Sequence, residues 1–387
     1  MKTAKLFILP LAFSVFSVMC TSAVQAQQWQ MLLDEATILS VTGDSDIELQ
    51  CLTALSDGRF IVADDLNDKL LLLDPNGATP TDKVKVMANQ TDIFNAIDSA
   101  NGTSPAPTVY SPRGSGVNSA GKFLFYSDGA SEPGTVIALE PTAPYTISVL
   151  STSVNGNPSP VEGGAGMWVG GNTAYLLVER NFGAAEDAVL KLDVSTIVND
   201  GSLVPTTLTG ETDLLTATGE ASNSSLAVNC TEGISPSATE IIVGNSGSGS
   251  SNDNLISINV STGAASLYLQ ATDIEADLPD SDIGFSDIAI SPNGDIILTN
   301  SFGGASFDDG VIHVTGITPP NGTATGWSET TIATDVGQPS GQVSHQDENA
   351  VWDATRNAFV IASDGNLTEG LLMIQMPPAT VGDWNLY

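Results

Sequence analysis

Acidic and amide side chains recur at the borders of short apolar segments in this chain. Glu48, Glu232, Asp287 and Glu348 each lie at or just before the start of such a segment. The next segment along the chain ends in a second set of polar residues, which comprises Asp64, Asp65, Asp128, Arg180, Asn181, Asn245, Asn300 and Asp364. Oxygen ligands drawn from several segments suit a hard cation with about six to eight ligands, and calcium is the best candidate.

A cation site of this kind competes with a simpler interpretation. Buried carboxylates without a cation repel one another, and calcium would relieve that repulsion. In a chain with 45 acidic residues, each of these side chains could instead cap a turn and face solvent. The sequence leaves both interpretations open.

Basic groups are scarce, which limits acid–base mechanisms. The chain has 11 Lys and Arg residues and two histidines. Arg113, at the start of one segment, could bind a substrate carboxylate or phosphate, or balance Glu48 and Glu232 in an ion pair. His345 lies three residues before Glu348 and could act as a general base, with Asp347 or Glu348 orienting it, or lie on the surface.

His313 has a different setting from His345. It alternates with apolar residues in GVIHVTG, so we expect it to be structural. No Gly-x-Ser-x-Gly, His-Glu-x-x-His or phosphate-binding glycine loop occurs in the chain, which removes the commonest alternative catalytic templates.

These polar positions belong to a pattern that occurs six times. Its first copy begins at Leu52 and reads LTALSDGRFIVADDLNDKLLLLDPNG, in which a Ser-Asp-Gly turn and a polar loop separate three apolar segments. The copies begin roughly 50 to 65 residues apart and break at hairpin turn signals such as Asp-Gly and Pro-Asn-Gly. Six such copies predict the blades of a β-propeller.

A propeller would bring the polar positions together. The start of each innermost strand and the end of each second strand emerge on one face, at the channel mouth. The last copy reaches Met376 with about three strands, and the segment from Trp29 to Val41 is a spare strand-like segment. We therefore predict an all-β fold, a single six-bladed β-propeller over residues 27–387, closed by an N-terminal strand and without helices.

The N-terminus predicts export. Lys2 and Lys5 precede an apolar run from Leu6 to Met19, and Val24-Gln25-Ala26 matches a signal-peptidase site, so we expect residues 1–26 to be a signal peptide. The mature protein would be secreted or periplasmic. That compartment permits a disulfide between the remaining cysteines, Cys51 and Cys230, but the sequence does not show whether they meet.

Net charge restricts the partners. A formal charge of −34 repels phosphate backbones and anionic lipids, which argues against nucleic acid and membrane surfaces. No segment after the leader reaches the roughly 20 apolar residues of a membrane span. We expect a monomer that takes a small-molecule substrate or an extracellular ligand.

The repeats resemble those of known propeller families. The first copy, with ADDLNDKLLLLDPNG, resembles the NHL repeat. The wider pattern, a strand, a Pro-Asn-Gly type of turn and a strand ending in Asp or Asn, is similar to the gluconolactonase and regucalcin-like propellers, which include diisopropylfluorophosphatase and, more distantly, paraoxonase. This resemblance covers residues 48–376 at the level of whole blades.

The resemblance implies a calcium ion in the channel, held by a Glu of the first blade, Asn residues of middle blades and an Asp of the fifth. Glu48 stands at the first-blade position, and Asp287 in FSDIAISPNGDIILTN matches the fifth-blade phrase. Two positions depart from the pattern, because Glu232 replaces the fourth-blade Asn and Arg113 stands where the second blade should offer an Asn.

Two functional hypotheses follow. The first is an exported calcium-binding hydrolase that opens a lactone or cleaves an ester or phosphoester at the channel mouth. Glu48, Glu232 and Asp287 would hold the metal, while His345 or a channel carboxylate activates water. The alternative is a non-catalytic extracellular propeller that binds a glycan, peptide or protein through the same face.

Overall fold

The structure is a computed structural model. It describes residues 29–101, 112–127, 134–152, 164–178, 187–219, 228–233, 239–245, 254–278, 283–303, 310–327, 332, 335–336, 350–363 and 370–376. Within these ranges the described side chains exclude those of residues 101, 112–113, 164–165, 228–233, 271, 283–286 and 300–303. The predicted signal peptide, residues 1–26, lies outside the described ranges.

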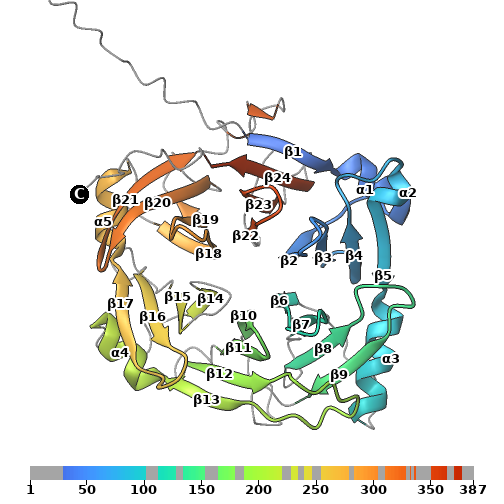
Figure 1. The fold of residues 1–387 in the computed structure, drawn as a ribbon, viewed down its shortest axis with the longest axis horizontal. Helices are drawn as coiled ribbons and strands as arrows, with labels where there is room; N and C mark the ends of the chain where they lie inside the picture. The colour runs from blue at the N-terminus through green and yellow to red at the C-terminus, as the bar shows by residue number, and fades with distance from the viewer. Residues whose placement is uncertain are drawn as a thin grey trace, which may run out of the picture.

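Six four-stranded antiparallel sheets surround a central channel, which confirms the predicted six-bladed β-propeller (Figure 1). Each of the first five sheets is built from four consecutive strands, so neighbours in sequence are neighbours in space. The repeated hairpin turn signals in the sequence predict this arrangement, because a short turn joins two antiparallel neighbouring strands.

The strands of the first three sheets are β2 (Leu49–Ala54), β3 (Phe60–Asp64), β4 (Lys69–Leu73) and β5 (Val84–Ala88); β6 (Pro112–Val117), β7 (Phe123–Ser127), β8 (Thr135–Leu139) and β9 (Ile147–Ser151); and β10 (Gly164–Gly170), β11 (Thr173–Val178), β12 (Ala188–Asp193) and β13 (Thr206–Gly210). The fourth and fifth sheets contain β14 (Val228–Gly233), β15 (Glu240–Asn245), β16 (Asn254–Asn259) and β17 (Ala265–Leu269), and β18 (Ile283–Ile290), β19 (Ile296–Gly303), β20 (Gly310–Thr318) and β21 (Asn321–Trp327).

The sixth sheet closes the ring with strands from both ends of the chain. Its order is β22 (Ala350–Asp353), β23 (Ala358–Ser363), β24 (Gly370–Gln375) and then β1 (Trp29–Asp34). β1 pairs antiparallel with β24 and forms the outermost strand, so the predicted closure by an N-terminal strand is confirmed.

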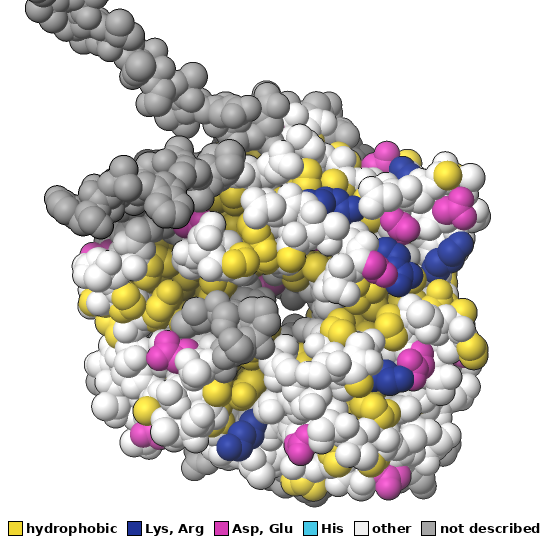
Figure 2. All heavy atoms as spheres, viewed as in Figure 1, with side chains coloured by type: hydrophobic (Ala, Val, Ile, Leu, Met, Phe, Trp, Pro, Cys, Tyr) yellow, Lys and Arg dark blue, Asp and Glu magenta, His cyan; other side chains and the backbone are white. Residues whose placement is uncertain are grey.

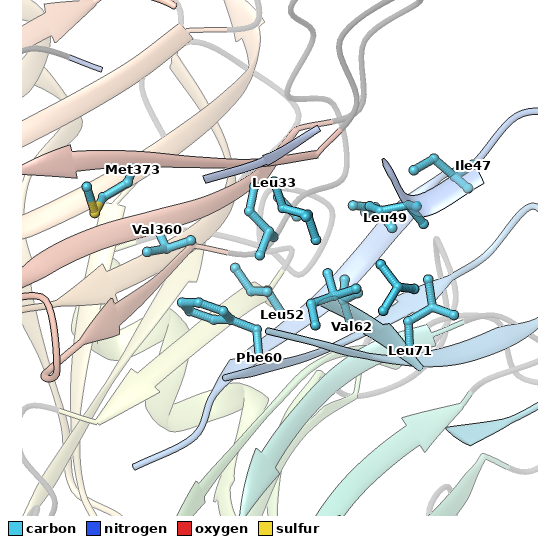
Figure 3. Packing of buried hydrophobic residues seen from close by; sticks show 14 of the residues in the cluster. Leu33, Ile47, Leu49, Leu52, Phe60, Val62, Leu71, Val360 and Met373 are labelled. Carbon is cyan, nitrogen blue, oxygen red and sulfur yellow. The ribbon is translucent and has the colours of Figure 1, made fainter. Parts of the chain in front are cut away.

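Apolar residues between neighbouring sheets form the core. Every residue of β3 is buried, and successive side chains face opposite neighbours. Phe60 and Val62 pack in the cluster that joins the sixth and first sheets (Figure 3), whereas Ile61 packs with Phe123 and Phe125 of the second sheet. Each such side chain contributes about 1.5–3 kcal/mol through burial, so the ring is stabilised mainly at its sheet interfaces.

The expectation that no helix follows the leader is wrong, because the described residues include five helices. They are α1 (Glu35–Thr42), α2 (Pro80–Lys83), α3 (Gln90–Asn101), α4 (Glu211–Thr218) and α5 (Ala271–Asp277). α1 also shortens the strand predicted to reach Val41, since β1 ends at Asp34.

Four of these helices occupy equivalent places. α1, α3, α4 and α5 each follow the outermost strand of one sheet and contact the outermost strand of the next, which is β5, β9, β17 or β21. Each buries an apolar residue against that strand, for example Ile38, Leu214 or Ile274. They lie at the perimeter in Figure 1, so they cover strand edges that would otherwise face solvent. No helix of the described residues is long and apolar enough to cross a bilayer.

Candidate functional site

The channel wall consists of the innermost strand of each sheet. β2, β6, β10, β14, β18 and β22 contact one another in sequence order, and β22 contacts β2 to complete the circle. Figure 2 shows one face of the ring, hollowed at its centre, where hydrophobic side chains lie beside the opening among uncoloured polar and backbone atoms.

Polar residues gather at the end of the channel where the inner strands begin. Antiparallel pairing places Leu49 opposite Asp64, Val228 opposite Asn245 and Phe285 opposite Asn300. Four second strands end in a buried polar residue, and β19 carries one four residues before its end: Asp64, Ser127, Asn245, Ser363 and Thr299. Because buried polar groups require hydrogen-bonding partners, this layer fixes the base of the mouth. We therefore take this end as the candidate functional site.

Glu48 lies at this mouth and is held by its neighbours. Its backbone N–H donates to a carboxylate oxygen of Asp64 at 3.3 Å, and its carbonyl accepts from the N–H of Asp65 at 2.8 Å. Its Oε1 also accepts a hydrogen bond from Nε2 of Gln50 at 2.9 Å. The side chain is half-buried. Residues of the first sheet therefore fix both its backbone and the orientation of its carboxylate.

Asp64 organises the loop beside Glu48. Its carboxylate is fully buried and accepts from Nδ2 of Asn67 at 2.9 and 3.1 Å and from the Asn67 N–H at 3.2 Å. The same Nδ2 donates to the carbonyl of Asp46 at 2.8 Å. Burial raises the pKa of Asp64 above its ordinary value of 3.8, although the hydrogen bonds from Asn67 and Glu48 act to lower it.

Asp287 lies in the fifth sheet, where it pairs with Thr299. Its Oδ2 accepts the backbone N–H of Ala350, the first residue of β22, at 2.7 Å. This bond crosses from the fifth sheet to the sixth. The carboxylate therefore has a structural role between sheets, besides any role in binding.

The pairing register separates the three predicted metal ligands by depth. Three cross-strand pairs, Leu49–Asp64, Phe285–Asn300 and Val228–Asn245, give a common reference level. Relative to it, Glu48 lies outside, while Asp287 and Glu232 lie progressively further inside, opposite Thr299 and Ile242. Glu48 and Glu232 therefore differ in depth along the channel by about four strand residues, or roughly 13 Å. A calcium ion holds its ligands within about 2.3–2.6 Å. The register thus favours Glu48 and Asp287 over Glu232 as partners in one site.

The other predicted site residues are only partly placed. Arg113 lies on β6 as the extra residue of a β-bulge between Pro112 and Gly114, but its side chain is outside the described ones. The side chain of Glu232 is likewise not described, and His345 and Glu348 lie outside the described residues altogether.

A calcium site has incomplete support. The parts of the chain that the structure describes contain no group of three or more His, Cys, Asp or Glu residues that could hold a metal ion. Glu48 and Asp287 offer oxygen ligands of the right kind, but both already accept hydrogen bonds from the protein. These residues do not by themselves fit a calcium centre, so no reaction step is derived through the metal.

Gln50 and Asn67 contribute to the mouth and were missed in the sequence. Asn67 carried a local signal, because Asp64 and Asn67 stand three residues apart in ADDLND, a spacing typical of an Asx-stabilised turn. Gln50 carried none, since its role depends on the pairing of β2 with β3.

The remaining sequence predictions concern His313 and the cysteines. His313 is buried on β20, as expected of a structural histidine. Cys51 is buried between the first and second sheets, whereas the side chain of Cys230 on β14 is not described, so their pairing stays a prediction.

Comparison with known proteins supports the fold. No protein-family model matches the chain, and no curated protein matches it in sequence. Among solved structures, a Bacteroides thetaiotaomicron protein of unknown function aligns with a TM-score of 0.54 and 9% identity, over 90% of this chain and 76% of its own.

Two further structures align at similar levels. A Thermus thermophilus protein provisionally assigned as an oxidoreductase (glucose dehydrogenase) has a TM-score of 0.52 and 9% identity, over 90% of this chain and 99% of its own. A protein provisionally assigned as a gluconolactonase has a TM-score of 0.50 and 9% identity, over 91% of this chain and 92% of its own. Such identities show the fold alone. The chain is a six-bladed β-propeller that resembles the gluconolactonase-like propellers in its fold.

Proposed function

We propose that this chain is an exported hydrolase that opens a lactone or cleaves an ester or phosphoester at the polar mouth of the channel. The observation that carries the proposal is the buried polar layer at the inner-strand starts, above which Glu48 presents a half-buried carboxylate. Pre-positioned polar groups at the mouth of a ring whose sheets pack through apolar residues are typical of a small-molecule site.

The proposal assigns roles to named residues. Glu48 and Asp287 would bind the polar end of the substrate or a calcium ion, with Glu232 deeper in the channel. Arg113 would contact a substrate carboxylate or phosphate, and His345, oriented by Glu348, would take the proton from water. Calcium enters only as an ion whose binding is to be tested.

Glu48→Gln and Asp287→Asn test the proposal with little disturbance. Each substitution removes a charge but keeps an oxygen that can accept the same hydrogen bond, from Gln50 or from the Ala350 N–H. We would measure calcium binding by calorimetry and screen lactones and aryl esters. We expect both variants to lose at least tenfold in turnover, because each removes a charge that would stabilise the transition state. Any calcium binding that the wild type shows should be lost as well.

Asp213→Asn is the matched control, because Asp213 is an exposed carboxylate on α4 at the perimeter. It should leave binding and turnover unchanged. Wild-type protein without calcium binding or turnover, or variants that behave like the control, would contradict the hydrolase.

One observation favours a second candidate function. The carboxylates of Glu48 and Asp287 are already engaged by protein donors, which is how structural residues behave. We therefore keep as the alternative a non-catalytic propeller that binds a glycan, peptide or protein at the same mouth. A glycan or peptide array with the mature protein tests it, and Glu48→Gln should weaken any binding found there.

A further inference from the structure

Three aromatic rings join the closing strand to the neighbouring sheet, away from the mouth. Trp29 is the first residue of β1, Trp327 ends β21 and His313 lies within β20. The Trp29 and Trp327 rings meet edge-to-face with centroids 5.8 Å apart, and the His313 ring stacks on Trp327 at 5.9 Å and 19°. Because β1 belongs to the sixth sheet, these rings link it to the fifth.

The rings lie in a mostly apolar cluster, in which Trp327 is partly buried. Trp29 and His313 are both buried, and Trp29 Nε1 and His313 Nε2 have no hydrogen-bond partner among the described residues. Across the fifth sheet His313 faces Ile297 and Thr325. A charged imidazolium here would carry an N–H without an acceptor.

Few charges surround His313. β19, β20, β21, β23 and β24 contain no charged residue, and β1 contains only Asp34 at its far end. The two inner strands of the same cluster, β18 and β22, each carry one acidic residue, Asp287 and Asp353. Asp295, just before β19, is the one described charge whose field acts on the ring. Burial lowers the pKa of His313 below its ordinary value of 6.5, against the smaller raising effect of Asp295.

The Trp327 ring opposes this effect without reversing it. A cation over an indole is attracted to the face of the ring. Burying an unpaired charge costs more free energy than this attraction returns, so the neutral ring is favoured in the closed state.

We propose that Trp29, Trp327 and His313 form an acid-sensitive clamp on the closing strand, in which protonation of His313 releases β1 from the fifth sheet. This clamp does not depend on the proposed function of the mouth. In mild acid, the contact between β1 and the fifth sheet would then be the first contact of the ring to weaken.

The sign of the pH dependence follows from proton linkage. The released state binds the proton more readily, with a pKa near 6.5, than the closed state does. The stability of the closed clamp is therefore fully present only well above pH 6.5, and it is lost as the pH falls through that value. If His313 stays neutral while closed, the ratio of released to closed protein rises about tenfold between about pH 7.5 and 5.5.

Hydrogen exchange of the full mature protein tests the clamp. We would compare protection factors, corrected for intrinsic exchange, in β1 and in β5, the outermost strand of the first sheet. Protection of residues 29–34 should fall by up to about tenfold over that range, while protection of residues 84–88 stays constant. An equal fall in both strands, or none in β1, would overturn the proposal.

Two histidine variants sharpen the test. His313→Phe keeps an aromatic ring for stacking but cannot be charged, so the pH dependence in β1 should disappear. His345→Gln, which changes the only other histidine of the chain, should retain it. A persisting pH dependence in His313→Phe would refute the clamp, and the comparison of β1 with β5 in the wild type decides the matter if that variant does not fold.

Discussion

At the scale of single residues, the mouth depends on hydrogen bonds that hold Glu48 from several sides. Asn67 reaches both the buried carboxylate of Asp64 and the carbonyl of Asp46, and Asp64 in turn binds the N–H of Glu48. The loop after β3 and the segment before β2 are thus fixed to each other. The position of Glu48 follows from this network more than from its own side chain.

Replacing Asn67 by Ala should therefore destabilise the protein. It leaves the buried Asp64 carboxylate without two side-chain donor contacts, and hydrogen bonds to charged groups contribute about 1.5–3 kcal/mol each. Denaturant unfolding should show that the free energy of unfolding falls by about 1.5–3 kcal/mol. Leu66→Ala in the same loop is the control, because Leu66 is exposed and such a change usually stays within about 0.5 kcal/mol. Equal effects would show that Asn67 is not the support we infer.

At the scale of elements, the strands were predictable and the helices were not. About three strands of each copy are short apolar segments bounded by turn residues such as Asp-Gly or Asn-Gly, so local chemistry specifies them. The perimeter helices are mostly two turns long or less, and a single buried residue such as Ile38 or Leu214 gives no clear helical period. A weak signal did exist, since Thr-Asp-Ile or Thr-Asp-Leu recurs at residues 91–93, 212–214 and 272–274, after an outermost strand each time.

The depth of the site residues was harder to predict than the strands. β6, β10 and β14 each carry an extra residue near their start, and β18 carries one as well. A bulge shifts the register by one residue, and register decides which side chains share a level. Counting from turn motifs therefore placed Glu232 beside Asp287, although the pairing puts it deeper.

The inner strands β6 and β10 approach so closely that only glycine fits at one position. A Cβ on Gly114 would lie 2.2 Å from the backbone nitrogen of Met167 and 2.8 Å from its Cα. Gly114→Ala should force the second and third sheets apart and cost about 1–3 kcal/mol or more. The measurement is thermal or denaturant unfolding.

Gly210→Ala provides the comparison for Gly114→Ala. Gly210 has an ordinary φ of −101° and nothing within 4 Å of its added Cβ, so only the modest loss of a helix N-cap is expected. If Gly114→Ala is no worse than this control, the two inner strands can separate without cost.

At the scale of the whole molecule, ring closure uses contacts that no local pattern reveals. Arg356 of the sixth sheet donates from Nη1 to the carbonyl of Gly58 in the first sheet at 2.9 Å, across 298 residues of sequence. Its guanidinium also lies over the Phe60 ring, 5.5 Å from the centroid. The Asp353–Arg356 pair is visible in the sequence as a turn, but its function as a link between the first and last sheets emerges only from the closed ring.

Arg356→Ala should consequently weaken the whole ring. The carboxylate of Asp353, whose side chain is 1% exposed, would lose the charge that it meets at 2.5 Å, and breaking a buried pair in this way costs about 3–5 kcal/mol. Arg59→Ala is the matched control, because Arg59 pairs with Asp57 at 2.7 Å where the side chains are 28% and 52% exposed. Such a surface pair contributes about 0–1 kcal/mol. Unfolding of both variants by denaturant should separate them by at least about 2 kcal/mol, and similar values would show that the ring closes without help from Arg356.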